Sequence, residues 1–365
     1  MSILNTLSTF SQTYAEARRK FLAAAHAAHL PVMSYPHPLK GRDGEDLATD
    51  VVRLGPPSAA RVLIVSSACH GVEGFCGSGP QIAFLESAEI RAQLQFSGIA
   101  VLLVHALNPH GFSHWRRVTE DNIDLNRNFQ NFSSALPANP GYAALHDIML
   151  PPVWPPVNND AAAQAFIAEH GMAKLQAVVS RGQHTHADGL FFGGTAATWS
   201  NRTIRQILRD HCAAAKTLGW IDIHTGLGPV GVGELILATR NNAADTARTK
   251  AWWGDKVVSF YDGTSSSAEL TGLMIEAAYD ECPNAAFASI ALEFGTVPTM
   301  DVMRALRADH WLAKHPETPA DQALAIKQQI RDAFYVDTDA WKEAIWAQTE
   351  DAMMKGLRGL KQNES

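Results

Sequence analysis

The sequence predicts an α/β protein in which helices cover both faces of a mixed sheet. Two observations predict this class. Short aliphatic or β-branched runs alternate along the chain with longer segments that have helical spacing. In addition, residues 62–65 and 101–104 are apolar throughout, as expected for central strands that are buried on both faces. With 365 residues, of which 46% are hydrophobic, the chain is long enough to bury such a core.

The candidate strands and helices follow from these two periodicities. The candidate strands are residues 51–54, 61–67, 99–105, 219–224, 234–239, 257–260 and 288–293, each near the length of a buried strand. The candidate helices are residues 7–29, 80–94, 160–180, 201–217, 243–254 and 321–334. Residues 339–360 show the same helical spacing and precede a polar terminus.

The stretch 136–159 is rich in proline and cannot form one regular element, because proline lacks a backbone donor. We expect a surface excursion that borders a pocket. The predicted organisation is one domain over residues 1–365, with an insertion around residues 136–201 and a helical tail over residues 319–365.

Composition excludes several classes of function. Lys and Arg total 30 against 37 Asp and Glu, a formal net charge of −7, and no basic block that could follow a phosphate backbone is present. No apolar run approaches the roughly 20 residues of a membrane span, and no secretory signal is visible, so we expect a cytoplasmic protein. Cys69, Cys76, Cys212 and Cys282 form no C-x-x-C pair, which argues against a disulfide scaffold and a thiolate zinc site.

A candidate metal site follows from two predicted strands. His70 and Glu73 stand in a glycine-containing turn directly after the run 61–67, and His224 ends the run 219–224. Imidazole nitrogens and carboxylate oxygens are ordinary zinc ligands, and a catalytic site needs three of them. The alternatives are a surface histidine beside a helix-capping glutamate, and a core histidine at a strand end.

Further charged residues stand at positions suited to substrate binding and catalysis. Arg117 and the pair Asn126 and Arg127 lie ten positions apart, and an arginine can bind a carboxylate bidentately or polarise a carbonyl. Glu293 ends the apolar run 288–293, where a carboxylate beside a metal site could act as general base. A solvated loop for the arginines, and a strand-end ion pair for Glu293, remain the alternatives.

The ordered motifs H-G-V-E, R-x8-N-R within D-L-N-R-N-F, D-I-H-T-G and L-E-F-G resemble those of the zinc carboxypeptidases of the carboxypeptidase A type. The resemblance implies an αβα sandwich with a mixed, mostly parallel eight-stranded sheet. It also implies a role for each motif residue: zinc ligands at His70, Glu73 and His224, a carbonyl-polarising arginine at Arg117, a carboxylate clamp at Asn126 and Arg127, and a catalytic base at Glu293.

The segments N-P-H-G-F (108–112), G-L-F-F-G-G (189–194) and W-S-N (199–201) resemble a bacterial branch of this superfamily, and the match spans about residues 60–296. The family's substrate-capping tyrosine has no counterpart at the expected spacing, Tyr261 and Tyr279 being the only candidates. His184 and His186 are expected to lie in a solvated or rim segment rather than to bind metal.

The expected function is hydrolysis of a peptide or amide bond next to a free carboxylate, with a small peptide or an N-acyl amino acid as substrate and zinc as cofactor. An N-acyl amino-acid deacylase of the aspartoacylase type shares H-x-x-E, D-L-N-R and the distal histidine, and is the alternative enzyme. A catalytically silent binding protein is the alternative of another class. No nucleic acid or membrane partner is expected, and the sequence leaves the oligomeric state open.

Overall fold

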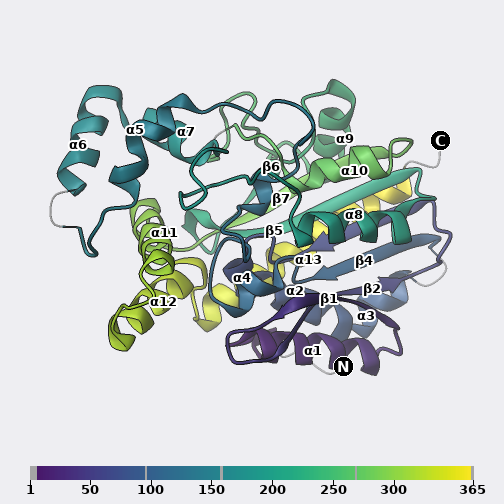
Figure 1. Ribbon diagram of the computed structural model, residues 1–365. Helices are drawn as coiled ribbons and strands as arrows, with labels where there is room; N and C mark the ends of the chain where they lie inside the picture. Colours follow the sequence, from purple (N-terminus) through teal and green to yellow (C-terminus); the bar gives the residue numbers. More distant parts are fainter. Residues whose placement is uncertain (1–5, 95–96, 157–158, 268, 363–365) are drawn as a thin grey trace.

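The computed structural model describes residues 6–94, 97–156, 159–267 and 269–362, and a mixed sheet forms its centre (Figure 1). In these residues the sheet has seven strands, in the order β1-β2-β4-β3-β5-β7-β6. The strands are β1 (Val32–Lys40), β2 (Asp46–Leu54), β3 (Arg61–Ser66), β4 (Ile99–His105), β5 (Thr217–Val230), β6 (Gly233–Leu237) and β7 (Ala286–Gly295). The four central strands are parallel, while β1, β2 and β6 pair antiparallel. The predicted fold class is confirmed, with seven strands in place of eight.

Helices cover both faces of this sheet. The α-helices are α1 (Tyr14–Ala27), α2 (Gly74–Glu86), α3 (Ala88–Leu94), α4 (Pro109–Ser113), α5 (Pro140–Met149), α6 (Asn159–His170), α7 (Met172–Ser180), α8 (Trp199–Cys212), α9 (Ala243–Trp253), α10 (Ala277–Glu281), α11 (Thr299–Lys314), α12 (Ala320–Phe334) and α13 (Asp339–Gln362). Short 3-10 helices are η1 (Thr6–Thr9), η2 (Gly71–Glu73), η3 (Leu125–Arg127) and η4 (Met274–Glu276).

Two apolar cores lie between the sheet and the helices on its two faces. Leu63 and Val65 of β3 point into one core with α1, α2, α9 and α13, while Val62 and Ile64 point into the other with α8 and α10. Successive side chains of a strand face opposite sides of a sheet, so a strand covered on both faces must be apolar at every position. The continuous apolar runs of the sequence therefore mark the central strands.

The observed strands differ from the predicted ones in two places. The edge strand β1 was not predicted, because its largely exposed side chains leave no buried face to recognise. Residues 257–260 do not form a strand of the sheet: Val258 makes one isolated bridge with Ile236, and the chain then turns. The apolar side chains of Val257 and Phe260 are buried without strand pairing beyond that bridge.

The predicted helices exist, but several of their limits differ. The segment 160–180 forms two helices, since Gly171 between α6 and α7 has a φ of 84° and interrupts the helix. Helix α2 begins at Gly74, six residues before the predicted start at Pro80. Its residues Gly74 to Leu85 are all buried, so no amphipathic stripe marked its beginning. Helix α11 was not predicted at all.

Helices α5, α6 and α7, from the segment 136–201, gather next to α11 in Figure 1. Their apolar side chains share one core: Leu145 and Met149 of α5, Val179 of α7, and Leu306 of α11. In addition, Arg307 Nε donates to the Met149 carbonyl at 3.1 Å. The limits of the single domain and its insertion stay predictions.

The four cysteines are buried free thiols. Among the described residues, every helix is too short or too polar to cross a membrane.

Candidate metal centre and active site

His70, Glu73 and His224 converge at the carboxyl ends of β3 and β5. His70 Nδ1 lies 3.0 Å from Glu73 Oε1, and His224 Nδ1 lies 2.9 Å from Glu73 Oε2 and 3.2 Å from His70 Nδ1. All three side chains are buried, and their ligand-type atoms lie within 4.8 Å of one another. The expected set of residues is therefore brought together in the structure.

The parallel pairing of β3 with β5 explains this convergence. Ser66 at the end of β3 is paired with Asp222, so the turn after β3 and the last residues of β5 reach the same edge of the sheet. The turn between His70 and Glu73 also requires a glycine. A Cβ at Gly71 would collide with the backbone of Gly111 and with the Arg116 carbonyl.

A carboxylate contacts Nε2 of each histidine, the ring nitrogen that is not the candidate metal ligand. His224 Nε2 lies 2.6 Å from Asp222 Oδ2, and His70 Nε2 lies 3.2 Å from Asp124 Oδ1. Such partners fix the tautomer of metal-binding histidines and leave Nδ1 free to act as ligand. The donor set therefore fits a zinc ion. Asp222 and Asp124 are absent from the residues predicted from the sequence. The pattern that marks Asp222 is D-x-H on one face of a strand, and Asp124 is the first residue of D-L-N-R.

A second group of ligand-type residues is formed by Cys69, Asp222 and His224. It shares His224 with the first group, and its Asp222 already contacts His224 Nε2 at 2.6 Å. Burial also raises the pKa of the Cys69 thiol well above its usual value, which disfavours the thiolate that a metal needs.

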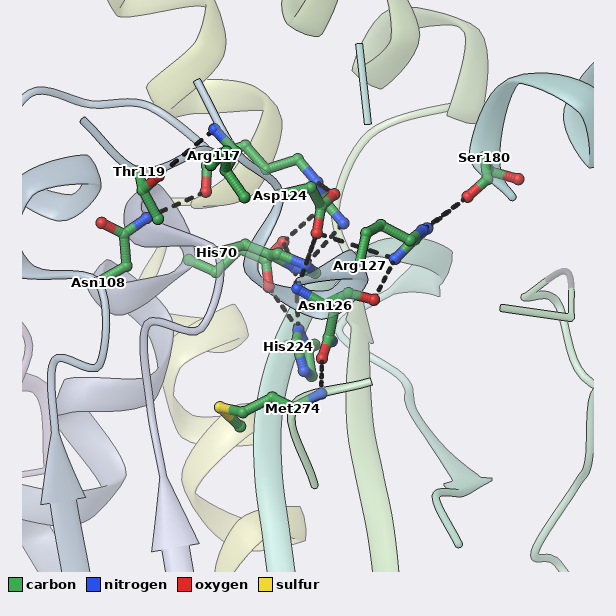
Figure 2. A network of polar contacts seen from close by, with 12 residues as sticks. His70, Asn108, Arg117, Thr119, Asp124, Asn126, Arg127, Ser180, His224 and Met274 are labelled. Atoms are coloured by element: carbon green, nitrogen blue, oxygen red, sulfur yellow. Dashed lines mark hydrogen bonds and ion pairs between the residues drawn. The ribbon is translucent and has the colours of Figure 1, made fainter. Parts of the chain in front are cut away.

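Arg117 lies beside the candidate metal ligands. Its Nη1 donates to Glu73 Oε1 at 3.0 Å, its Nε donates to Asp124 Oδ2 at 3.0 Å, and its Nη2 lies 2.8 Å from His70 Nε2. The N-P-H-G-F motif holds this segment, because Asn108 Nδ2 donates to the Arg117 carbonyl at 3.4 Å (Figure 2).

Asn126 and Arg127 stand on η3 and line the same cavity as the two histidines. The Asn126 side-chain oxygen accepts from the Met274 backbone at 2.9 Å. Arg127 is buried, and its Nε and Nη2 donate to the carbonyl of Ser180 at the end of α7 (Figure 2). Burial lowers the pKa of Arg127 to about 10, which leaves the guanidinium charged at neutral pH.

Glu293 faces this cavity from β7. It is paired in register with His224 on the neighbouring strand, and its Oε1 accepts from the Leu227 backbone at 3.0 Å. Burial and then the negative charge of Glu73 raise the pKa of Glu293 to about 8. A carboxyl group with a pKa near neutrality is suited to take up and return a proton.

The cavity has a volume of about 150 Å³ and mainly apolar walls beyond the candidate metal centre. Its walls include apolar side chains from β6, from the segment after α9, from α11 and from the end of α12: Ile236, Leu237, Phe260, Leu270, Leu273, Val302, Met303, Leu306 and Phe334.

Tyr261 and Tyr279 lie outside the cavity lining and use their hydroxyl groups elsewhere. Tyr261 donates to the Thr239 carbonyl at 3.0 Å, and Tyr279 donates to Asp245 at 2.8 Å. Neither supplies a hydroxyl group to the candidate site in this structure.

His184 and His186 also lie outside the cavity lining. His184 Nδ1 is 2.7 Å from the Gly194 carbonyl, while the His186 ring packs on the ring of His146.

The sheet order and the placement of the site define a metallocarboxypeptidase-like α/β fold. Carboxypeptidase A from Helicoverpa armigera matches the structure with a TM-score of 0.53 at 14% identity, over 97% of this chain and 74% of that chain. The chain belongs to the family described as "Protein of unknown function (DUF2817)", which matches residues 10–348.

Two further solved structures are more distant. Bovine thrombin-activatable fibrinolysis inhibitor has a TM-score of 0.44 at 11% identity, over 94% of this chain and 99% of that chain. The metallo-carboxypeptidase from Burkholderia cenocepacia has a TM-score of 0.38 at 11% identity, over 89% of this chain and 69% of that chain. A comparison with curated proteins found no match. At these identities the likeness concerns the fold alone.

Proposed function

We propose that the protein is a zinc-dependent hydrolase that cleaves a peptide or amide bond next to a free carboxylate. One observation carries the proposal. The buried side chains of His70, His224, Glu293 and Arg127 line one cavity, and Glu73 contacts both histidines. Sites that combine a metal, an acid-base group and an anion-binding group are typical of metallohydrolases.

His70, Glu73 and His224 would hold the zinc ion through Nδ1, a carboxylate oxygen and Nδ1, respectively. A zinc ion at this site would act as a Lewis acid on a substrate carbonyl and would lower the pKa of water toward neutrality. Asp222 accepts from His224 Nε2 and keeps the hydrogen on that nitrogen, so that His224 Nδ1 presents a lone pair, while His70 Nε2 contacts both Asp124 and Arg117.

Glu293 is the proposed general base. Its carboxylate takes a proton from the attacking water and returns it to the leaving amine, while the Leu227 N–H fixes the orientation of the carboxyl group. Arg117 lies beside the metal ligands and is the proposed donor to the oxygen of the scissile carbonyl. Arg127 and Asn126 are the proposed site for the free carboxylate of the substrate.

An N-acyl amino-acid deacylase would use the same residues in the same roles. The mainly apolar walls of the cavity accept either a peptide residue or a simple acyl group. The two activities differ in the group on the acyl side of the bond, so substrate comparison separates them.

Metal analysis followed by a substrate screen tests the proposal. We expect one zinc per chain, loss of hydrolysis of small peptides or N-acyl amino acids on chelation, and recovery when zinc is added. The triple substitution of His70, Glu73 and His224 by alanine should abolish zinc binding, while exposed His26→Ala serves as the control. Stoichiometric zinc retained by the triple variant would show that the metal lies elsewhere.

A further inference from the structure

Helix α7 forms one wall of the cavity. Gln176 and Ser180 stand one helical turn apart and both line it. The Gln176 amide donates to the Ser266 carbonyl at 3.2 Å, across to the segment that follows α9. At the other end of this turn, the Ser180 carbonyl accepts from Arg127 Nε at 3.1 Å. Hydrogen bonds thereby join the helix to Arg127 and to the segment that follows α9.

Helix α11 forms a second wall. Four of its residues line the cavity at helical spacing: Thr299, Val302, Met303 and Leu306. One face of this helix therefore borders the cavity that contains the candidate metal centre. Leu306 also belongs to the same apolar core as Val179 of α7. The two walls come from segments that 118 residues separate in the sequence.

The space between these walls is small. A cavity of about 150 Å³ is comparable with an engineered protein cavity of about 150 Å³ that accepts one benzene molecule. The charged residues in its lining all belong to the candidate site, and the remaining lining residues are neutral. Such a space suits one apolar side chain or a short acyl group.

We propose that α7 and α11 restrict the enzyme to small substrates, namely an amino acid that carries one short, uncharged acyl or aminoacyl group, and exclude longer peptides. This inference rests on the proposed function and specifies its substrate class. The free carboxylate lies at Arg127, and the side chain and the acyl group occupy the apolar space between the two helices.

A length series with one scissile bond tests this restriction on the zinc-loaded enzyme. N-acetyl-leucine, the dipeptide Ala-Leu and a hexapeptide ending in Ala-Leu present the same carboxylate and side chain. We expect kcat/KM for the hexapeptide to be at least about 100-fold below that of the best short substrate, a discrimination within the reach of steric exclusion. Equal kcat/KM values for the short substrates and the hexapeptide would overturn the inference.

A substitution on α11 tests whether this helix causes the restriction on substrate length. Met303→Ala removes side-chain volume from the cavity wall, whereas Met300→Ala makes the same change at a position that is 53% exposed and outside the lining. We expect Met303→Ala to raise the ratio of hexapeptide to dipeptide kcat/KM by about tenfold, and Met300→Ala to leave it unchanged. An equal ratio in both variants would contradict a role for α11.

Binding measurements separate this inference from the proposed reaction. Calorimetric titration of Glu293→Gln with N-acetyl-leucine and with the hexapeptide reports access to the cavity without turnover. Tighter binding of the short ligand supports the restriction even when no hydrolysis is found, and in that case only the proposed function fails. Equal affinity for both ligands refutes the restriction while leaving hydrolysis intact.

Discussion

At the residue scale, the candidate metal centre shifts the pKa values of two buried carboxyl groups in opposite directions. Burial alone would raise the pKa of Glu73, but the charges and hydrogen bonds of His70 and His224 hold it below its usual range. Burial and the charge of Glu73 instead raise the pKa of Glu293 to about 8. Carboxyl groups whose pKa values are pushed apart are suited to different roles, here ligand and base.

The first prediction separates these two roles. Glu293→Gln should retain zinc and lose about 10²- to 10⁴-fold in turnover, because an amide cannot accept the proton of water. Glu73→Gln should instead lower zinc retention, because it removes an anionic ligand. Elemental analysis and turnover measured on both variants check the prediction.

The exposed substitution Glu86→Gln, on helix α2, controls for the chemical change itself. Near wild-type turnover in Glu293→Gln would remove this residue from the mechanism. Full zinc occupancy in Glu73→Gln after dialysis would remove Glu73 from the ligand set.

At the scale of elements, η3 is held in place by segments that lie far from it in the sequence. The backbone of Asp124 donates to the Phe192 carbonyl at 2.8 Å, and Asn128 Nδ2 donates to the Gly193 carbonyl at 2.9 Å. The carbonyl of Ser180 accepts from Arg127. The segment 180–194 thus positions the proposed carboxylate site.

The second prediction concerns the close approach of this segment to Arg127. Gly182 has a φ of 95°, and a Cβ placed on it would lie 2.7 Å from Arg127 Cδ. Gly182→Ala should therefore displace the arginine and raise KM by about tenfold with a smaller change in kcat, as expected when binding of the ground state is lost. Steady-state kinetics on the shortest good substrate measure the effect.

Gly171→Ala is the matched control at the other end of α7. Its φ of 84° also lies in a region where an added side chain is strained, by about 1–3 kcal/mol, but no atom lies within 4 Å of the added Cβ. Both variants should lose stability, and only Gly182→Ala should change KM. The same KM in both variants would show that the segment does not position Arg127.

At the scale of the whole molecule, the core contains a histidine that makes stability depend on pH. His105 lies at the end of β4, 2.8 Å from the Ser78 hydroxyl and stacked on the Phe21 ring. Burial lowers the pKa of His105 to about 4. The folded protein therefore keeps this side chain neutral in a pH range where the unfolded chain binds a proton.

The third prediction follows from this difference. The contribution of His105 to the free energy of unfolding is fully present above pH 6.5. It is lost as the pH falls toward 4, because the unfolded state binds more protons than the folded state over that range. The free energy of unfolding should fall by up to about 3 kcal/mol more in the wild type than in His105→Gln, since one pKa unit corresponds to about 1.4 kcal/mol. Urea unfolding between pH 7 and pH 4.5 measures it.

Exposed His26→Gln, on α1, should follow the wild type throughout this range. A constant difference in stability between the wild type and His105→Gln at all pH values would show that His105 does not titrate on unfolding.

The central strands and the candidate ligands could be predicted from local sequence patterns. Strands that are buried on both faces must be apolar throughout, which identified β3 and β4. Parallel strands end at one edge of the sheet, so His70, His224 and Glu293 could be expected to meet. The convergence of these side chains needed no knowledge of distant packing.

The surroundings of these residues depend on contacts between segments that are distant in the sequence. The exposed edge strand β1 has no periodic apolar face, and residues 257–260 are apolar because they are buried, without being a strand of the sheet. The contacts of Ser180 with Arg127, and the two helical walls of the cavity, join segments that are far apart in the chain. A local sequence pattern predicts that a side chain is buried. Which segment covers that side chain depends on packing across the whole molecule.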